Sequence, residues 1–217
     1  MVLTPVRPAL GDVEVTPMRR RHLRGVLAIE RQVYPRPWSP GLFASELFQR
    51  DTRRYLVALS GRRVVGYAGV MVAAGEAHVT TVAVHPQEHR RKIATRLMLA
   101  LMEASRELGA EAATLEVRVG NKGAQRLYQG FGFAPVGIRP GYYAETGEDA
   151  LIMWAHDLQT SAYAERLARQ RDRLAQPGGA SGAPDHPVPW VQGRVGLPAG
   201  EGASLRAPAG GDLEGED

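Results

Sequence analysis

The stretch His78-Val79-Thr80-Thr81-Val82-Ala83-Val84-His85-Pro86-Gln87-Glu88-His89-Arg90-Arg91-Lys92-Ile93-Ala94-Thr95-Arg96-Leu97 decides the fold predicted for this chain. It predicts a strand that ends at Val84, a basic loop and the start of a helix. A helix N-terminus presents unpaired backbone N–H groups and a positive dipole end, which together favour an anion such as pyrophosphate. A loop of solvated arginines before a surface helix would explain the same charges, so the stretch alone leaves both interpretations open.

The residues that follow predict a helix and then a strand, a short helix and two strands. One face of the first helix carries the apolar residues Ile93, Leu97, Leu101, Ala104 and Leu108. Gly109 is suited to end that helix, and residues 112–118 alternate as a strand does. Asn121 can cap a short helix through Tyr128. Strands are expected at 134–138 and 149–156.

The residues before the stretch predict two helices and a hairpin. Thr16-Pro17 and Ser39-Pro40 each combine a capping residue with a first-turn proline, which is typical of a helix start. Residues 55–59 and 64–73 predict a β-hairpin, and residues 77–84 a further strand. The succession of elements places the chain in the α/β class, with a mixed sheet and helices on both of its faces.

Composition divides the 217 residues into four parts. We expect residues 1–10 to be a flexible N-terminus, residues 11–158 to form one α/β domain and residues 159–175 to add a polar helix. Residues 176–217 are rich in Gly, Pro and Ala and cannot bury enough apolar surface to offset their ordering entropy. We therefore expect disorder there.

Composition also excludes several classes of protein. Cysteine is absent, which excludes a disulfide framework, a thiolate zinc cluster and a cysteine nucleophile. No apolar run approaches the roughly 20 residues needed to span a bilayer, and no export signal opens the chain, so we expect a cytoplasmic protein that is not bound to a membrane. Residues 1–158 hold 21 basic and 15 acidic side chains, which suits an anionic cofactor. Because the basic residues are dispersed and no nucleic-acid motif accompanies them, direct nucleic-acid binding is not expected.

The loop and helix of the opening stretch resemble the coenzyme A pyrophosphate motif of the GNAT superfamily of N-acetyltransferases. The likeness rests on Val84-x-Pro86, the basic segment, Ala94 and the Leu-rich helix. The family motif has Gln or Arg, two residues, Gly, one residue, then Gly or Ala. Here His89 stands at the first position and Lys92 replaces the first glycine. Glycine permits close backbone approach to phosphate, so we expect coenzyme A binding to be altered, while the Lys92 N–H is retained and its ammonium adds positive charge.

A second set of motifs resembles a narrower group, the bacterial ribosomal-protein alanine N-acetyltransferases of the RimI type. The set comprises Leu115-Glu116-Val117-Arg118, Asn121, Leu127-Tyr128 and Gly130-Phe131-Gly132-Phe133. The segment from Tyr34 to Ser39 is similar to that group's P-W-S loop, and Tyr142-Tyr143 with Glu148–Met153 to its Tyr-rich loop and closing strand. The likeness runs from about residue 12 to residue 157.

The resemblance implies a fold, a cosubstrate and an acceptor. The fold would be a mostly antiparallel mixed sheet, splayed where acetyl-CoA binds, with no metal. The acceptor would be the α-amine of a protein N-terminus, such as that of a ribosomal protein that begins with Ala. Direct attack of this amine on acetyl-CoA in a ternary complex, without an acetyl-enzyme, would transfer the acetyl group.

The resemblance also implies a set of site residues. Glu116 would remove a proton from the amine, which is largely protonated at neutral pH, and Tyr128 would assist the leaving thiolate. Cofactor contacts would come from Val82, Ala83, Val84, Arg90, Arg91, Lys92, Ile93, Ala94, Thr95 and Asn121. The peptide groove would be lined by Trp38, Tyr142 and Tyr143.

From the residues alone, plainer interpretations stay open. Glu116 could be a solvated strand carboxylate paired with Arg118. Tyr128 shares a helical face with Ala124, Leu127 and Phe131 and could be a core residue, although a tyrosine can bury its ring and keep its hydroxyl in a cleft. Asn121 could be a helix cap, and the three aromatic residues could serve packing.

Two other functions also stay open. A GNAT fold can serve lysine side chains or small-molecule amines as acceptors. A non-catalytic coenzyme A binding module would suit Lys92 and the long tail, but it would need neither Glu116 nor Tyr128. The oligomeric state is not predicted by the sequence.

Overall fold

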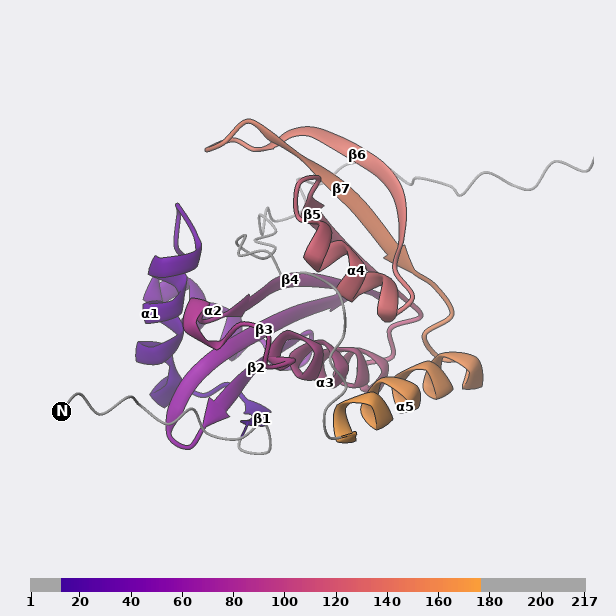
Figure 1. Cartoon of the computed structure of the whole chain (residues 1–217), viewed down its shortest axis with the longest axis horizontal. Helices are drawn as coiled ribbons and strands as arrows, with labels where there is room; N and C mark the ends of the chain where they lie inside the picture. The colour runs from indigo at the N-terminus through magenta and orange to yellow at the C-terminus, as the bar shows by residue number, and fades with distance from the viewer. Residues whose placement is uncertain (1–12, 177–217) are drawn as a thin grey trace, which may run out of the picture.

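A seven-stranded sheet runs through residues 13–176, the part of the chain that the computed structural model describes (Figure 1). Its order is β1-β2-β3-β4-β5-β7-β6. The strands are β1 (Val13–Pro17), β2 (Arg53–Ser60), β3 (Arg63–Ala73), β4 (Glu76–Val84), β5 (Ala112–Arg118), β6 (Ala134–Tyr143) and β7 (Glu148–Ala155). The prediction for residues 1–10 lies outside the described residues, and so does that for residues 176–217 apart from Gln176, the C-cap of α5.

The sheet is mostly antiparallel and opens at one place. All neighbouring strands pair antiparallel except β4 and β5, which pair in parallel. That parallel pairing consists of Glu76 with Ala112, Ala77 with Ala113 and His78 with Thr114, after which the strands part. The predicted mixed sheet, splayed between these strands, is thereby confirmed.

Helices cover both faces of the sheet, as predicted. On one face lie α1 (Leu23–Val33) and α2 (Pro40–Phe48), over a core that includes Phe43, Tyr55 and Tyr67. On the other face α3 (Ile93–Glu107), α4 (Lys122–Gly130) and α5 (Ser161–Ala175) contribute to a larger core. Short 3-10 turns, η2 (Arg20–His22) and η3 (Pro86–Glu88), precede α1 and α3.

Local sequence signals explain most helix ends. Ser39 accepts a hydrogen bond from the Leu42 N–H with Pro40 in the first turn of α2, and Asn121 accepts one from the Ala124 N–H at the start of α4. Gly109 has a φ of 80° just after α3, where its lack of a Cβ is needed.

The prediction that a helix begins at Thr16-Pro17 is wrong. Both residues belong to β1 and pair with Val57 and Leu56 of β2. β1 is the edge strand, so a proline there, which has no N–H, deprives no neighbouring strand of a hydrogen-bond donor. The same proline therefore fits a strand end as well as a helix start, and α1 begins at Leu23 instead.

A bulge in β4 directs side chains to both faces just where the strand leaves β5. The pairing with β3 shifts between Gly69 and Val70, so Val70 pairs with Val79 and Gly69 with Thr81. Val79 and Val82 both lie in the core beneath α3. The hydroxyl of Thr81 instead contacts Tyr34, from α1's side of the sheet.

The helix α5 packs against the ends of α3 and α4. Tyr163 and Leu167 lie in the larger core, and the Tyr163 hydroxyl donates to the carbonyl of Phe131 at 2.9 Å. The amide of Gln170 donates to the carbonyl of Gly130 at 2.7 Å. The α5 helix therefore completes the core on this face. Among the described residues, no helix has both the length and the apolar composition needed to cross a membrane.

Candidate active site

The loop between β4 and α3 forms a pocket at the start of α3. The pocket is lined by Val84, Glu88, His89, Arg90, Lys92, Ile93, Ala94, Thr95 and Leu127. It therefore gathers many of the predicted cofactor residues in one place. The side chain of Lys92 does not cap the helix, so the first-turn N–H groups face this loop.

Lys92 adopts the backbone conformation for which glycine is favoured. Its φ is 54° and ψ is 22°, and Arg90, two residues earlier, also has a positive φ of 63°. A left-handed conformation costs a residue with a Cβ roughly 1–2 kcal/mol. The Lys92 ammonium donates to the carbonyl of Arg173 in the last turn of α5, at 3.2 Å. This lysine therefore joins the pocket loop to α5.

Arg91 stabilises the conformation of the loop between β4 and α3. Its side chain is buried and pairs with Glu88, which also pairs with Arg63 of β3. Burial favours a higher pKa for Glu88, but the two arginines outweigh it and the pKa is lowered. The neighbouring Arg90 is exposed at the rim of the pocket.

Along the open edge of β4, main-chain groups face the gap. The side chains of Val82, Ala83 and Val84 are all buried. Past His78 no ladder to β5 uses the polar groups on that edge. The carbonyl of Val82 accepts a hydrogen bond from the Tyr34 hydroxyl at 3.2 Å.

Glu116 projects from β5 into the interior rather than into solvent. Its residue exposure is 3%, and its Oε1 lies 3.2 Å from Nη1 of Arg139. Its Oε2 lies 3.1 Å from Nε2 of His78 and has no hydrogen-bond partner among the described residues. Burial favours a higher pKa, but His78 and Arg139 outweigh it, so the Glu116 pKa is lowered and the group is a carboxylate at neutral pH.

Two buried polar atoms on the α4 side have no hydrogen-bond partner among the described residues: the Tyr128 hydroxyl and the Asn121 Nδ2. Asn121 does cap α4, through its Oδ1. Burial, and then Tyr143, raise the pKa of Tyr128 far above its usual value, so it remains a neutral phenol. Buried polar atoms without a partner are uncommon and mark places where a ligand can bind.

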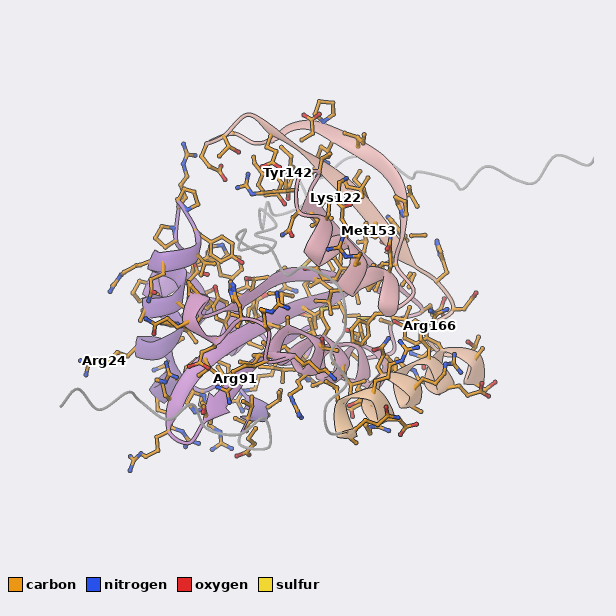
Figure 2. All side chains as sticks on the ribbon, in the orientation of Figure 1. Arg24, Arg91, Lys122, Tyr142, Met153 and Arg166 are labelled. Carbon is orange, nitrogen blue, oxygen red and sulfur yellow. The ribbon has the colours of Figure 1, made fainter. Side chains whose placement is uncertain are left out.

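The three predicted groove residues have different surroundings. Trp38 is 9% exposed and packs on Phe43, with ring centres 5.2 Å apart, as part of the core under α1 and α2. Tyr143 is buried, and its hydroxyl donates to the carbonyl of Glu116 at 3.5 Å. Tyr142 lies under the arch formed by β6 and β7 (Figure 2). The two tyrosines thus lie near Glu116, whereas Trp38, itself in the loop between α1 and α2, packs into the core.

Sequence reasoning missed two residues that contact Glu116. His78 is the third residue of β4, and its position at the last β4–β5 pair depends on a pairing that no local pattern encodes. Arg139 lies one residue beyond the predicted end of its strand, because β6 continues to Tyr143. Only the alternation of side chains along an extended β6 could have suggested it.

The residues present fit acetyl-CoA. The pocket at the start of α3 is basic and lies beside helix N–H groups, which suits a pyrophosphate. The unpartnered Asn121 Nδ2 and Tyr128 hydroxyl lie on α4, whose Leu127 lines the same pocket. Among residues 13–176, no group of three His, Asp or Glu side chains is placed to hold a metal.

Comparisons with known proteins give the same assignment. The sequence profile of the acetyltransferase (GNAT) family matches residues 23–133. A Bacillus subtilis (strain 168) protein with the provisional name [ribosomal protein bS18]-alanine N-acetyltransferase is 36% identical over 137 residues, covering 63% of this chain and 91% of that protein. The [ribosomal protein bS18]-alanine N-acetyltransferase of Escherichia coli (strain K12) is 32% identical over 127 residues, covering 58% and 84%.

Solved structures share the fold. The crystal structure of the ribosomal-protein-S18-alanine N-acetyltransferase from Escherichia coli superimposes with a TM-score of 0.61 at 27% identity, covering 67% of this chain and 94% of that one. The PaiA N-acetyltransferase from Thermoplasma acidophilum, solved in complex with coenzyme A, has the same fold, with a TM-score of 0.56 at 16% identity over 66% of this chain and 98% of that one.

The protein is an acetyl-CoA-dependent N-acetyltransferase, because the splayed sheet, the loop before α3 and the matching relatives all agree. The chain belongs to the acetyltransferase (GNAT) family.

Proposed function

We propose that this enzyme acetylates the N-terminal α-amine of a cytoplasmic protein, a ribosomal protein that begins with Ala, by direct attack in a ternary complex. The proposal rests on one observation, the hydrogen bond from the Tyr143 hydroxyl to the Glu116 carbonyl beside the gap between β4 and β5. A buried carboxylate beside this gap is suited to receive a proton from an ammonium group. The curated relatives named above act, by their names, on alanine of ribosomal protein bS18.

The chain supplies the remaining parts of the reaction. The loop before α3 would hold the pyrophosphate of acetyl-CoA, and Asn121 would use its unpartnered Nδ2 on the same cosubstrate. Acetyl-CoA, when bound, supplies the thioester carbon that the amine attacks. Main-chain N–H groups on the open edge of β4 would stabilise negative charge on the thioester oxygen.

Glu116 would accept the proton of the substrate amine, and Tyr128 would donate a hydrogen bond to the leaving group. Glu116 accepts the ammonium proton, so that the nitrogen lone pair becomes available for attack. The Tyr128 hydroxyl, buried and without a partner among residues 13–176, would donate a hydrogen bond to the departing sulfur as its charge develops. Because burial raises the Tyr128 pKa, the phenol is protonated when it is needed. No residue of the chain has to carry the acetyl group.

The test is acetylation of matched peptides with labelled acetyl-CoA. A peptide that begins with Ala and contains internal lysines is compared with the same peptide blocked at its N-terminus. Mass spectrometry of fragments is expected to place the label on the α-amine of the free peptide and to find none on the blocked one. Label only on internal lysines would refute the acceptor assignment, and label on the enzyme itself would refute direct attack.

A further inference from the structure

His78 lies at the point where the sheet opens, on the same side as Glu116. It is the last β4 residue paired with β5, opposite Thr114, and its ring reaches along the sheet to Glu116, two residues further on in β5. Its Nε2 lies 3.1 Å from Oε2 of Glu116, the carboxylate oxygen that receives no hydrogen bond from the described residues. The imidazole of His78 is therefore close enough to exchange a proton with Oε2 of Glu116, which accepts no hydrogen bond from the described residues.

The two partners differ in their access to water. The Glu116 side chain is 4% exposed, whereas that of His78 is 27% exposed. A proton that enters the buried carboxylate must leave it before the next turnover. The contact with His78 connects that carboxylate to a side chain that is partly exposed to solvent.

Two charged groups of the described residues are placed near His78 by their contacts. On the neighbouring strands its paired residues are Met71 of β3 and Thr114 of β5, and neither titrates. Glu116 of β5 contacts it directly, and Arg139 of β6 reaches it only through the other oxygen of that carboxylate. The Arg139 cation beside Oε1 makes Glu116 a weaker base, so a protonated Glu116 carboxyl gives its proton readily to a stronger base next to it, such as an imidazole. Imidazoles exchange protons readily near neutral pH.

We propose that His78 acts through Glu116 as the residue that takes up the acceptor's proton and returns it to water. This inference rests on the proposed function. The N–H bond of the substrate ammonium breaks and its proton passes to the Glu116 carboxylate. The carboxyl group then gives the proton to Nε2 of a neutral His78, which leaves a carboxylate beside an imidazolium. The imidazolium loses its Nδ1 proton to water, and the neutral ring exchanges its remaining Nε2 proton for one on Nδ1 through water. Glu116 and His78 therefore both end the cycle as they began it.

The first test is the pH profile of turnover with an Ala-terminated peptide. His78→Gln keeps a polar side chain of similar reach but cannot carry the proton. Turnover of this variant is expected to fall about 10-fold or more at pH 7, up to the roughly 10²- to 10⁴-fold that general acid–base catalysis contributes. At pH 9.5, where the α-amine is already free, it should come within about 3-fold of the wild-type enzyme. The matched control is His156→Gln, because His156 stacks on Trp154 at the end of β7 and lies outside this cluster.

A structural role for His78 predicts a different profile. Loss of turnover by the same factor at every pH would overturn the proposal. Added imidazole gives a second criterion: it should restore part of the turnover of His78→Ala at pH 7, and no rescue together with a uniform loss would count against a proton-relay role.

A second measurement does not depend on the acceptor. The carboxyl ¹³C signal of Glu116 is followed by NMR as pH is lowered, in the wild-type protein, His78→Gln and His156→Gln. If the two side chains share a proton, the Glu116 titration should move to higher pH in His78→Gln by about half a unit or more, and stay in place in His156→Gln. If the Glu116 titration is the same in His78→Gln as in the wild-type protein, the relay is refuted even if the peptide is acetylated. Failure of the wild-type protein to acetylate the peptide would refute the proposed acceptor while leaving this measurement valid.

Discussion

The guanidinium carbon of Arg118 lies 3.8 Å from the centre of the Tyr143 ring, so one arginine both stacks on this ring and holds the turn beyond it. Its Nη1 donates to Thr146 and Glu148 at 2.7 and 2.9 Å, and its Nη2 to Glu145 at 2.9 Å. Glu148 in turn accepts from the N–H of Gly120 at 3.1 Å. Arg118 thus fixes the β6–β7 turn relative to the end of β5.

Replacing Arg118 by Met should loosen this turn and raise the KM for the peptide acceptor about 10-fold, because Tyr142 and Tyr143 would lose their fixed positions. The affinity for coenzyme A should change little, since the pocket at α3 is elsewhere. Steady-state kinetics and a calorimetric titration measure the two effects. Arg169→Met, on the exposed face of α5, is the control. An unchanged KM would show that the turn keeps its place without Arg118.

Glu116→Gln should lower kcat by about 10²- to 10⁴-fold, because the amide cannot accept the ammonium proton. The affinity for acetyl-CoA should remain within about 2-fold of that of the wild-type enzyme, since the cosubstrate pocket does not include this residue. Turnover with saturating peptide, together with a binding titration, separates the two effects. Wild-type turnover in Glu116→Gln would remove the carboxylate from the mechanism.

Tyr128→Phe should lower kcat about 10-fold or more without lowering stability. The lost hydroxyl is buried with no partner in the described chain, so its removal should leave the free energy of unfolding unchanged or raise it by up to about 1 kcal/mol. Tyr163→Phe offers the opposite pattern: it loses the 2.9 Å bond to Phe131, should cost about 1 kcal/mol and should keep its turnover. Denaturant unfolding and turnover are measured on both, and destabilisation by Tyr128→Phe would contradict the assignment.

Lys92→Gly and Lys92→Ala should differ in stability. Both lose the contact with the Arg173 carbonyl, but only glycine relieves the positive φ. The glycine variant is expected to be more stable than the alanine variant by about 1 kcal/mol in denaturant unfolding. It should also bind coenzyme A at least as tightly as Lys92→Ala does. Equal stability of the two variants would mean that the loop relaxes without strain at residue 92.

Glu30 should make stability depend on pH in the direction opposite to that of a carboxylate with a lowered pKa. It is fully buried, and burial raises its pKa to about 6, although Tyr67 and the Trp38 N–H donate to it. The folded state therefore binds the Glu30 proton more tightly than the unfolded state does. The cost of burying the charge is present above pH 6 and is lost as pH falls toward 4.5. Between pH 7.5 and 5, the free energy of unfolding of wild type should rise relative to Glu30→Gln by about 1 kcal/mol. A constant difference between the two proteins would contradict the raised pKa.

Elements governed by local chemistry could be predicted from the sequence. The caps at Ser39 and Asn121 and the end of α3 at Gly109 depend on residues within one turn, and the structure has them where predicted. The start of α1 was mispredicted because Pro17 fits an edge strand and a helix start equally well. A local signal therefore fails where pairing with a distant strand decides the conformation.

The candidate site could be predicted only in part, for the same reason. Motif likeness selected Glu116, Tyr128 and many of the residues of the α3 pocket, but not Glu88 or Leu127. The neighbours of Glu116 are set by strand pairing: His78 comes from β4, and Arg139 comes from a β6 longer than its pattern suggested. Likewise, Trp38 is packed in the core because Phe43 and Tyr55 surround it, which its loop sequence does not reveal.

The separation of β4 from β5 after three paired residues leaves the β4 edge of the cleft to main-chain atoms, which every residue except proline supplies alike. Substitutions along Val82–Val84 should thus be tolerated as far as the core below accepts their volume. Additional pairs between the two strands would shorten the opening without changing any functional side chain. Evolutionary drift here is restrained by strand geometry more than by residue identity.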